Sequence, residues 1–164
     1  MNGAMKAILL VEDNPNDVTL VLHALKRGRI MNPIVVVRDG IEALDFLFAR
    51  GAYGERAGAP APLLILDLKL PKLGGLDVLK AIRADARFHE LPALVLTSSK
   101  EDEDRISGHS LGLTRYLRKP LAFAEFVEAV KMLGSYWVMI DKSPQRGIDE
   151  AAAPPLEPPD GSGI

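Results

Sequence analysis

One stretch of the sequence decides the fold: residues 63–75, which read LLILDLKLPKLGG. Four apolar residues without a polar interruption are typical of a short strand that is buried on both faces. The run leads directly into Asp67, and Pro71 and the Gly74-Gly75 pair end it. Asp67 is therefore expected at the carboxyl end of a strand, the edge where open parallel sheets bind ligands. An Asp at a strand end is often only a turn former or a helix cap, so the rest of the chain decides.

The composition indicates one globular domain with a core of its own. The chain has 164 residues, of which 48% are hydrophobic and 26% are charged. Its net charge of −2 provides no bulk positive charge for nucleic acid or for a membrane surface. The absence of cysteine excludes disulfides, thiol catalysis and cysteine-bound metals. Neither a signal peptide nor a membrane-spanning run is recognisable, so we expect a cytoplasmic protein with no nucleic-acid or membrane partner.

Strand-like and helix-like segments alternate five times along the chain. Each of five short, mostly apolar runs is followed by a stretch whose apolar residues recur at helical spacing. The expected strands are residues 7–11, 34–37, 63–66, 93–96 and 116–118. Right-handed crossovers place the helices on both faces of a parallel sheet, and the common strand order at this length is 2-1-3-4-5. We therefore expect an α/β, doubly wound, flavodoxin-like fold with a five-stranded sheet.

Charged and hydroxyl side chains follow four of these strands. Glu12 and Asp13 come after the first strand, Asp67 after the third, Thr97 after the fourth and Lys119 after the fifth. Because the carboxyl ends of parallel strands meet at one edge, these side chains are expected to lie together. Crowded carboxylates repel one another unless a cation neutralises them, and an all-oxygen cluster suits Mg²⁺. Asp67 is then placed for phosphorylation, with Lys119 and Thr97 positioned to hold the phosphoryl oxygens.

These positions resemble the receiver domain of two-component response regulators. Besides the acidic pair, the matching residues are the acceptor Asp67, the hydroxyl Thr97, the aromatic Tyr116 and the Lys119-Pro120 dipeptide. Each of them alone is a weak signal, but the whole set with its spacing is specific to this family.

The resemblance divides the chain into two parts. It covers roughly residues 5–140, so we expect residues 1–140 to form the receiver domain. Residues 141–164 are polar and rich in proline, a composition that favours extended, fluctuating chain. This tail is expected to be disordered or, alternatively, to serve as a dimer arm.

The resemblance also implies a metal-assisted phosphorylation site. Asp67 would accept a phosphoryl group from the phosphohistidine of a sensor histidine kinase. Asp13, Asp67 and the backbone carbonyl of Lys69 would bind Mg²⁺, and Glu12 would assist directly or through water.

A switch accompanies this site in the family. Thr97 and Lys119 would contact the phosphoryl oxygens, and Tyr116 would change rotamer as Thr97 is drawn inward. The bond between Lys119 and Pro120 would be cis, which only X-Pro bonds adopt cheaply.

Three features narrow the resemblance to the small stand-alone receivers that pair with bacterial phytochrome-type histidine kinases. They are the long loop of residues 53–61, the DLKLPK run of residues 67–72 and the LGSYW run of residues 133–137. The expected partner is therefore a sensor histidine kinase, with a bacteriophytochrome as the particular candidate.

A second apolar stripe on the last expected helix suggests self-association. It consists of Ala129, Met132, Tyr136, Met139 and Ile140, beside the stripe that faces the sheet. These residues either fold under the tail or form a dimer face. We favour a homodimer that uses the fourth helix, the fifth strand and the fifth helix.

The expected function is that of a single-domain response regulator, a phosphorylation-switched binding module without turnover of an external substrate. A phosphotransfer intermediate in a multistep phosphorelay is the alternative. A flavin-binding electron carrier shares the sheet order, but Glu12 and Asp13 would repel the flavin phosphate. A Mg²⁺-dependent phosphatase with an aspartate nucleophile needs a second acid two positions later, where this chain has Lys69.

Overall fold

Five strands and five α-helices alternate in the computed structural model, which describes residues 7–54, 63–107 and 114–133. The strands are β1 (Ile8–Val11), β2 (Ile34–Val37), β3 (Leu64–Asp67), β4 (Ala93–Thr97) and β5 (Thr114–Arg118). The helices are α1 (Pro15–Arg27), α2 (Gly40–Phe48), α3 (Gly75–Arg83), α4 (Lys100–Ser107) and α5 (Phe123–Leu133). A short 3-10 turn, Gly51–Tyr53, follows α2.

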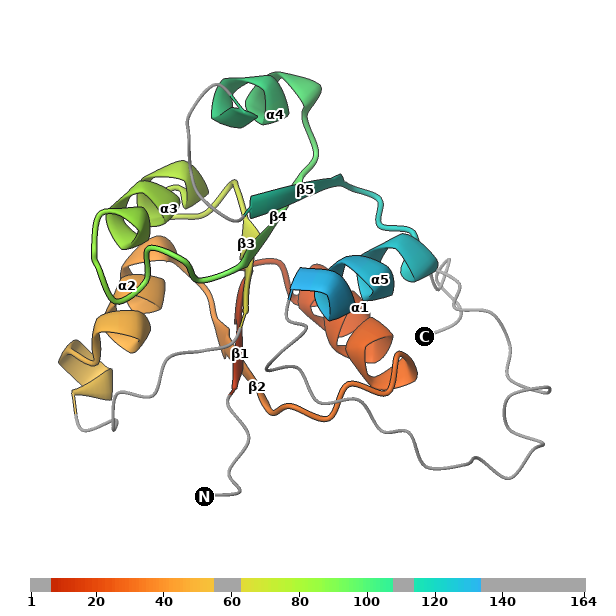
Figure 1. Ribbon diagram of the computed structural model, residues 1–164, viewed down its shortest axis with the longest axis horizontal. Helices are drawn as coiled ribbons and strands as arrows, with labels where there is room; N and C mark the ends of the chain where they lie inside the picture. The colour runs from red at the N-terminus through yellow and green to blue at the C-terminus, as the bar shows by residue number, and fades with distance from the viewer. Residues whose placement is uncertain (1–6, 55–62, 108–113, 134–164) are drawn as a thin grey trace.

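The strands form one parallel sheet in the order β2-β1-β3-β4-β5. Helices α2 and α3 cover one face of the sheet and helices α1 and α5 cover the other (Figure 1). The fold class and the strand order expected from the sequence are thus confirmed. The chain passes from β1 to β2 on one side of β1 and crosses back from β2 to β3 on its other side, so the switch point where such sheets bind ligands lies between the ends of β1 and β3.

The apolar runs are uninterrupted because both faces of the central strands are covered. Along β1, Leu9 and Val11 pack with the α2 and α3 side, whereas Ile8 and Leu10 pack with the α1 and α5 side. All four side chains are fully buried. Burying one such aliphatic side chain contributes about 1.5–3 kcal/mol, so the two apolar layers hold the sheet edge in place.

Side-chain caps fix the loops at that edge. The Asn14 side chain accepts hydrogen bonds from the backbone N–H groups of Asn16 at 2.8 Å and Asp17 at 3.3 Å, and Pro15 begins α1. This arrangement matches the cap expected before a helix that starts with proline. The chain therefore turns directly from the end of β1 into α1, which holds the intervening acids close to the sheet.

Two details differ from the expectations. Strand β5 begins at Thr114 rather than Tyr116, because an edge strand tolerates the polar residues that precede the tyrosine. Ala129 does not belong to a second apolar stripe, since it is 0% exposed and packs in the core between α5 and the sheet. Met132 is 63% exposed. The remaining residues assigned to the dimer face, and the tail, lie outside the described residues: Tyr136, Met139, Ile140 and residues 141–164.

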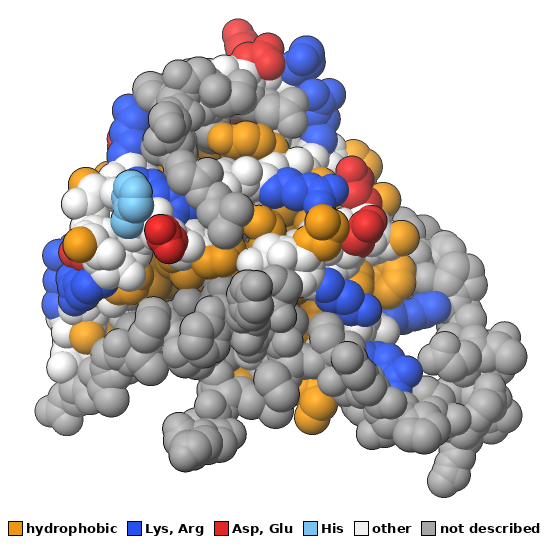
Figure 2. All heavy atoms as spheres, in the orientation of Figure 1, with side chains coloured by type: hydrophobic (Ala, Val, Ile, Leu, Met, Phe, Trp, Pro, Cys, Tyr) orange, Lys and Arg blue, Asp and Glu red, His pale blue; other side chains and the backbone are white. Residues whose placement is uncertain are grey.

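The described surface carries charges of both signs. On the face shown in Figure 2, basic and acidic side chains are interspersed with small hydrophobic areas. Among the described residues, none of the helices combines the length and the apolar character that crossing a membrane requires.

The start of α3 yields a prediction about stability. A Cβ atom on Gly75 would lie 2.6 Å from the carbonyl oxygen of Asp67 and 2.8 Å from the Cα of Leu68. Since both neighbours are backbone atoms, we expect Gly75→Ala to lower the free energy of unfolding by about 2–3 kcal/mol in urea titrations.

Gly74→Ala is the matched control for this prediction. A Cβ atom there meets its nearest neighbour only at 4.0 Å, and the φ of −67° suits alanine. The control loses only the N-cap preference for glycine, which amounts to less than about 1 kcal/mol. Equal losses in the two variants would contradict the close approach of α3 to the end of β3.

Candidate functional site

Two neighbouring strands, β1 and β3, bring acidic residues to one edge of the sheet. Glu12 follows β1 directly, and its backbone N–H still donates to the carbonyl of Val37 at 3.0 Å. Asp67 is the last residue of β3 and pairs in register with Leu96 of β4. The backbone hydrogen bonds of the sheet therefore fix the positions of Glu12 and Asp67 independently of any side-chain contact.

The acids form a compact cluster. Glu12, Asp13 and Asp67 each offer one carboxylate oxygen, and these oxygens all lie within 4.8 Å of one another. Glu12 and Asp67 are buried, with 1% and 7% of their surface exposed, whereas Asp13 is exposed. The cluster therefore opens to solvent on the side of Asp13.

One ammonium group lies against this cluster. The Nζ of Lys119 is 3.2 Å from Oε1 of Glu12 and 3.3 Å from Oδ1 of Asp67. The Lys119 backbone N–H donates to the carbonyl of Thr97 at 2.8 Å, which holds the loop after β5 beside the end of β4. The bond between Lys119 and Pro120 is cis.

A fourth carboxylate, which the sequence analysis did not single out, belongs to the same network. Lys119 Nζ donates to Oδ2 of Asp17 at 2.8 Å, its shortest contact with an acid. Asp17 lies in the first turn of α1, four residues after Asp13. A spacing of four residues is about one turn of a helix, and Asn14-Pro15 marks a helix start. These two features of the sequence could have indicated that Asp17 lies near the acidic cluster.

The electrostatics reflect burial of charge. Burial raises the pKa of Asp67, the charges of Asp13 and Asp17 raise it further, and Lys119 partly offsets the increase. Burial also raises the pKa of Glu12, and the nearby charge of Asp67 adds to that shift. Burial opposes the charged form of Lys119, but the hydrogen bond to Asp17 and the charges of Asp67 and Glu12 raise its pKa overall.

This donor set fits a divalent cation. All its ligand atoms are oxygens, and the carboxylates repel one another when ionised. Burial and the neighbouring acids raise the pKa of Glu12 and of Asp67, and Lys119 offsets this only in part. Hard dications such as Mg²⁺ and Mn²⁺ prefer such oxygen sites.

Thr97 ends β4 beside β3, whereas Tyr116 lies earlier on β5, in register with Val95, and both side chains are engaged outside the acidic cluster. Thr97 is 1% exposed, and its hydroxyl donates to the carbonyl of Ser99 at 3.0 Å while accepting from the Ser99 N–H at 3.1 Å. Tyr116 is half-buried on β5 and packs against the apolar layer on the α2 and α3 side. To donate to a phosphoryl oxygen, the Thr97 hydroxyl would have to give up the hydrogen bond that it donates to the Ser99 carbonyl.

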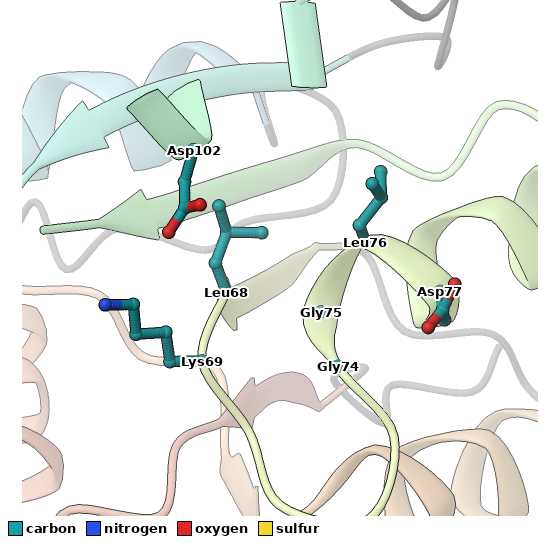
Figure 3. Close-up of a pocket in the computed structure, with 7 residues that line it drawn as sticks. All are labelled: Leu68, Lys69, Gly74, Gly75, Leu76, Asp77 and Asp102. Atoms are coloured by element: carbon teal, nitrogen blue, oxygen red, sulfur yellow. The ribbon is translucent and has the colours of Figure 1, made fainter. Parts of the chain in front are cut away.

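A groove of about 370 Å³ lies between the β3–α3 loop and α4, beginning at the residue that follows Asp67. Its lining residues are Leu68, Lys69, Gly74, Gly75, Leu76, Asp77 and Asp102. Asp102 points from α4 toward the loop that carries Lys69, and Asp77 lies on the opposite wall (Figure 3). The Lys69 side chain is exposed. The loop after Asp67 is therefore reachable from solvent.

Comparison with known proteins agrees with this geometry. The arrangement of strands and helices is the flavodoxin-like receiver fold. A family model described as the response regulator receiver domain matches residues 8–131, so the chain belongs to the response regulator receiver family.

Similar proteins include several response regulators, one of which is described as a bacteriophytochrome response regulator. Response regulator Rcp1 of Synechocystis sp. is 36% identical over 134 residues, which are 81% of this chain and 89% of Rcp1. The solved bacteriophytochrome response regulator RtBRR is 39% identical with a TM-score of 0.77, over 88% of this chain and 87% of RtBRR. The solved Mn²⁺-bound form of Rcp1 is 33% identical with a TM-score of 0.66, over 85% of this chain and 99% of that chain.

The raised pKa of Asp67 predicts a pH-dependent loss of stability without metal. When the pKa of a carboxyl group is raised in the folded state, its contribution to the free energy of unfolding is complete below its ordinary pKa of about 4. This contribution is lost as the pH rises through the folded-state pKa, which for Asp67 is the raised value. Asp67→Asn should therefore unfold at higher urea concentration than the wild type at pH 7 in EDTA. The difference should shrink toward pH 4.

Asp77→Asn removes an exposed acid from the first turn of α3 and serves as the control. It should follow the wild type across the same pH range, apart from a few tenths of a kcal/mol from the helix dipole. An Asp67→Asn variant that is less stable than the wild type at pH 7 would show that Lys119 more than offsets the burial of Asp67.

Proposed function

We propose that this chain acts as a single-domain response regulator whose Asp67 accepts a phosphoryl group from a sensor histidine kinase. One observation carries the proposal: the buried Asp67 carboxylate ends the central strand, with oxygens of Glu12 and Asp13 within 4.8 Å and the ammonium of Lys119 at 3.3 Å. This combination supplies a nucleophile, a place for a cation and a fixed positive charge in one partly shielded site.

The transfer requires little from the protein besides positioning and charge. A carboxylate oxygen of Asp67 forms a bond to phosphorus while the phosphorus–nitrogen bond of the kinase phosphohistidine breaks. The electron pair of that bond stays on the imidazole, which leaves as a neutral ring when its other nitrogen carries a proton. The donors around Asp67 stabilise the charge on the phosphoryl oxygens during the transfer. The product is an acyl phosphate, and no external substrate is turned over.

Mg²⁺ is the proposed cofactor. Asp13, Asp67 and the backbone carbonyl of Lys69 would hold the ion, and Glu12 would assist directly or through water. Its charge would neutralise the carboxylates and the incoming phosphoryl group. The oxygen-only cluster and its excess of negative charge support this assignment.

The proposed switch links the acyl phosphate to β5. Thr97 and Lys119 would each take one phosphoryl oxygen, and Tyr116 would change rotamer as Thr97 leaves Ser99. A shift from mostly inactive to mostly active requires about 5 kcal/mol of differential stabilisation, which a charged group gripped by a metal, a hydroxyl and an ammonium is suited to supply.

The proposed partners are a bacteriophytochrome histidine kinase in the cytoplasm and a second copy of the chain. The similarity to the bacteriophytochrome response regulator RtBRR over 87% of its length supports the kinase assignment. The exposed Met132 on α5 supports a homodimer through α4, β5 and α5, in which Tyr136, Met139 and Ile140 would extend the contact.

Acetyl phosphate with Mg²⁺ tests the central proposal. The intact mass of the wild type should rise by one phosphoryl group, EDTA should prevent the increase, and Asp67→Asn should abolish it. Asp77→Asn, in the first turn of α3, should be labelled like the wild type. Sustained hydrolysis of phosphate esters by the wild type would instead indicate a phosphatase.

Sedimentation velocity tests the proposed homodimer. Met132→Glu should weaken self-association at least about tenfold, because burying one unpaired carboxylate in an interface costs more than about 1.4 kcal/mol. Met31→Glu, at a methionine that is 50% exposed outside α5, should leave the association unchanged. A wild type that is monomeric with and without a phosphoryl analogue would contradict the dimer.

A further inference from the structure

The shortest acid contact of Lys119 is made with a residue outside the acidic cluster. Its Nζ lies 2.8 Å from Asp17, compared with 3.2 Å from Glu12 and 3.3 Å from Asp67. Asp17 comes from α1, whereas the cluster of Glu12, Asp13 and Asp67 belongs to strand ends. The ammonium therefore bridges two kinds of carboxylate, one of which takes no part in the cluster.

A divalent ion and this ammonium compete for the same oxygens. The acids of the cluster that Lys119 contacts are Glu12 and Asp67, which are also two of the three candidate ligands. Two cations on the same oxygens repel each other strongly in a partly buried site. Lys119 must therefore give up part of its contact with Glu12 and Asp67 when an ion enters, and Asp17 is the carboxylate that remains available to it.

The surroundings of Asp17 and Lys119 strengthen their pairing. The Lys119 side chain is 19% exposed and the Asp17 side chain 33% exposed. A cavity of about 90 Å³ adjoins the pair, and the side chains of Leu20, Val21 and Leu96 contribute to its lining. Apolar neighbours reduce the screening of the pair by water, and the cavity leaves room for the ammonium to shift.

We propose that Asp17 is a positioning residue that holds the ammonium of Lys119 when a divalent ion occupies the cluster of Glu12, Asp13 and Asp67. Its effect on the metal thus passes through Lys119. The inference rests on the proposed function, because it assumes that the cluster binds Mg²⁺. It adds a residue of α1 to the machinery that controls metal access and prepares Lys119 for the phosphoryl group.

A double-mutant cycle on Mg²⁺ affinity tests this inference, with calorimetric titration of Mg²⁺ alone as the measurement. Asp17→Asn should weaken Mg²⁺ binding about fivefold, because Lys119 then competes harder for Glu12 and Asp67. In a Lys119→Gln background, the same substitution should change the affinity by less than about twofold, since no ammonium needs to be held. Asp17→Glu keeps the charge and should restore binding close to that of the wild type.

The outcomes separate the inference from the proposed function. If Asp17→Asn weakens binding equally with and without Lys119, Asp17 acts only through its negative charge and the inference is overturned, while the metal site stands. If the wild type binds no Mg²⁺, the proposed function fails first and the inference fails with it. Asp77→Asn should change the affinity less than about twofold, and unfolding midpoints in EDTA confirm that every variant folds.

Discussion

Negative charge gathered at one edge of the sheet is the constraint on which the structure depends. Glu12 and Asp67 are buried at the ends of neighbouring strands, and Asp13 lies within reach of both. Carboxylates at this distance are unfavourable when ionised unless positive charge compensates them. Lys119 supplies one such charge, and the remaining excess of negative charge favours a divalent ion.

The apolar layers make this arrangement possible. Both faces of β1 and β3 are covered, so the strands cannot relax to separate the acids. The close approach of Gly75 to the backbone of Asp67 fixes the start of α3 against the same edge. Stability supplied by the core thus offsets the unfavourable charge at the site, a common relation between scaffold and functional residues.

The fold was predictable because buried parallel strands leave uninterrupted apolar runs, and helices between them leave a different periodicity. The acidic cluster and Lys119 were predictable because strand ends in such a sheet converge. Asp17 was missed, since its role depends on where the first turn of α1 points relative to Lys119. The bond from Thr97 to Ser99 also escaped prediction, because it depends on the conformation of one loop. The dimer face remains a prediction, as most of it lies beyond the described residues.

One measurement tests the account most directly: a crystal structure of the chain with Mg²⁺ and beryllofluoride, which imitates a phosphoryl group on aspartate. The account predicts beryllofluoride on Asp67 and the Thr97 hydroxyl turned from Ser99 to a fluorine. It predicts the ion on Asp13, Asp67 and the backbone carbonyl of Lys69, with Glu12 bound to it directly or through water. Beryllofluoride on another residue, or an ion bound away from these carboxylates, would contradict it.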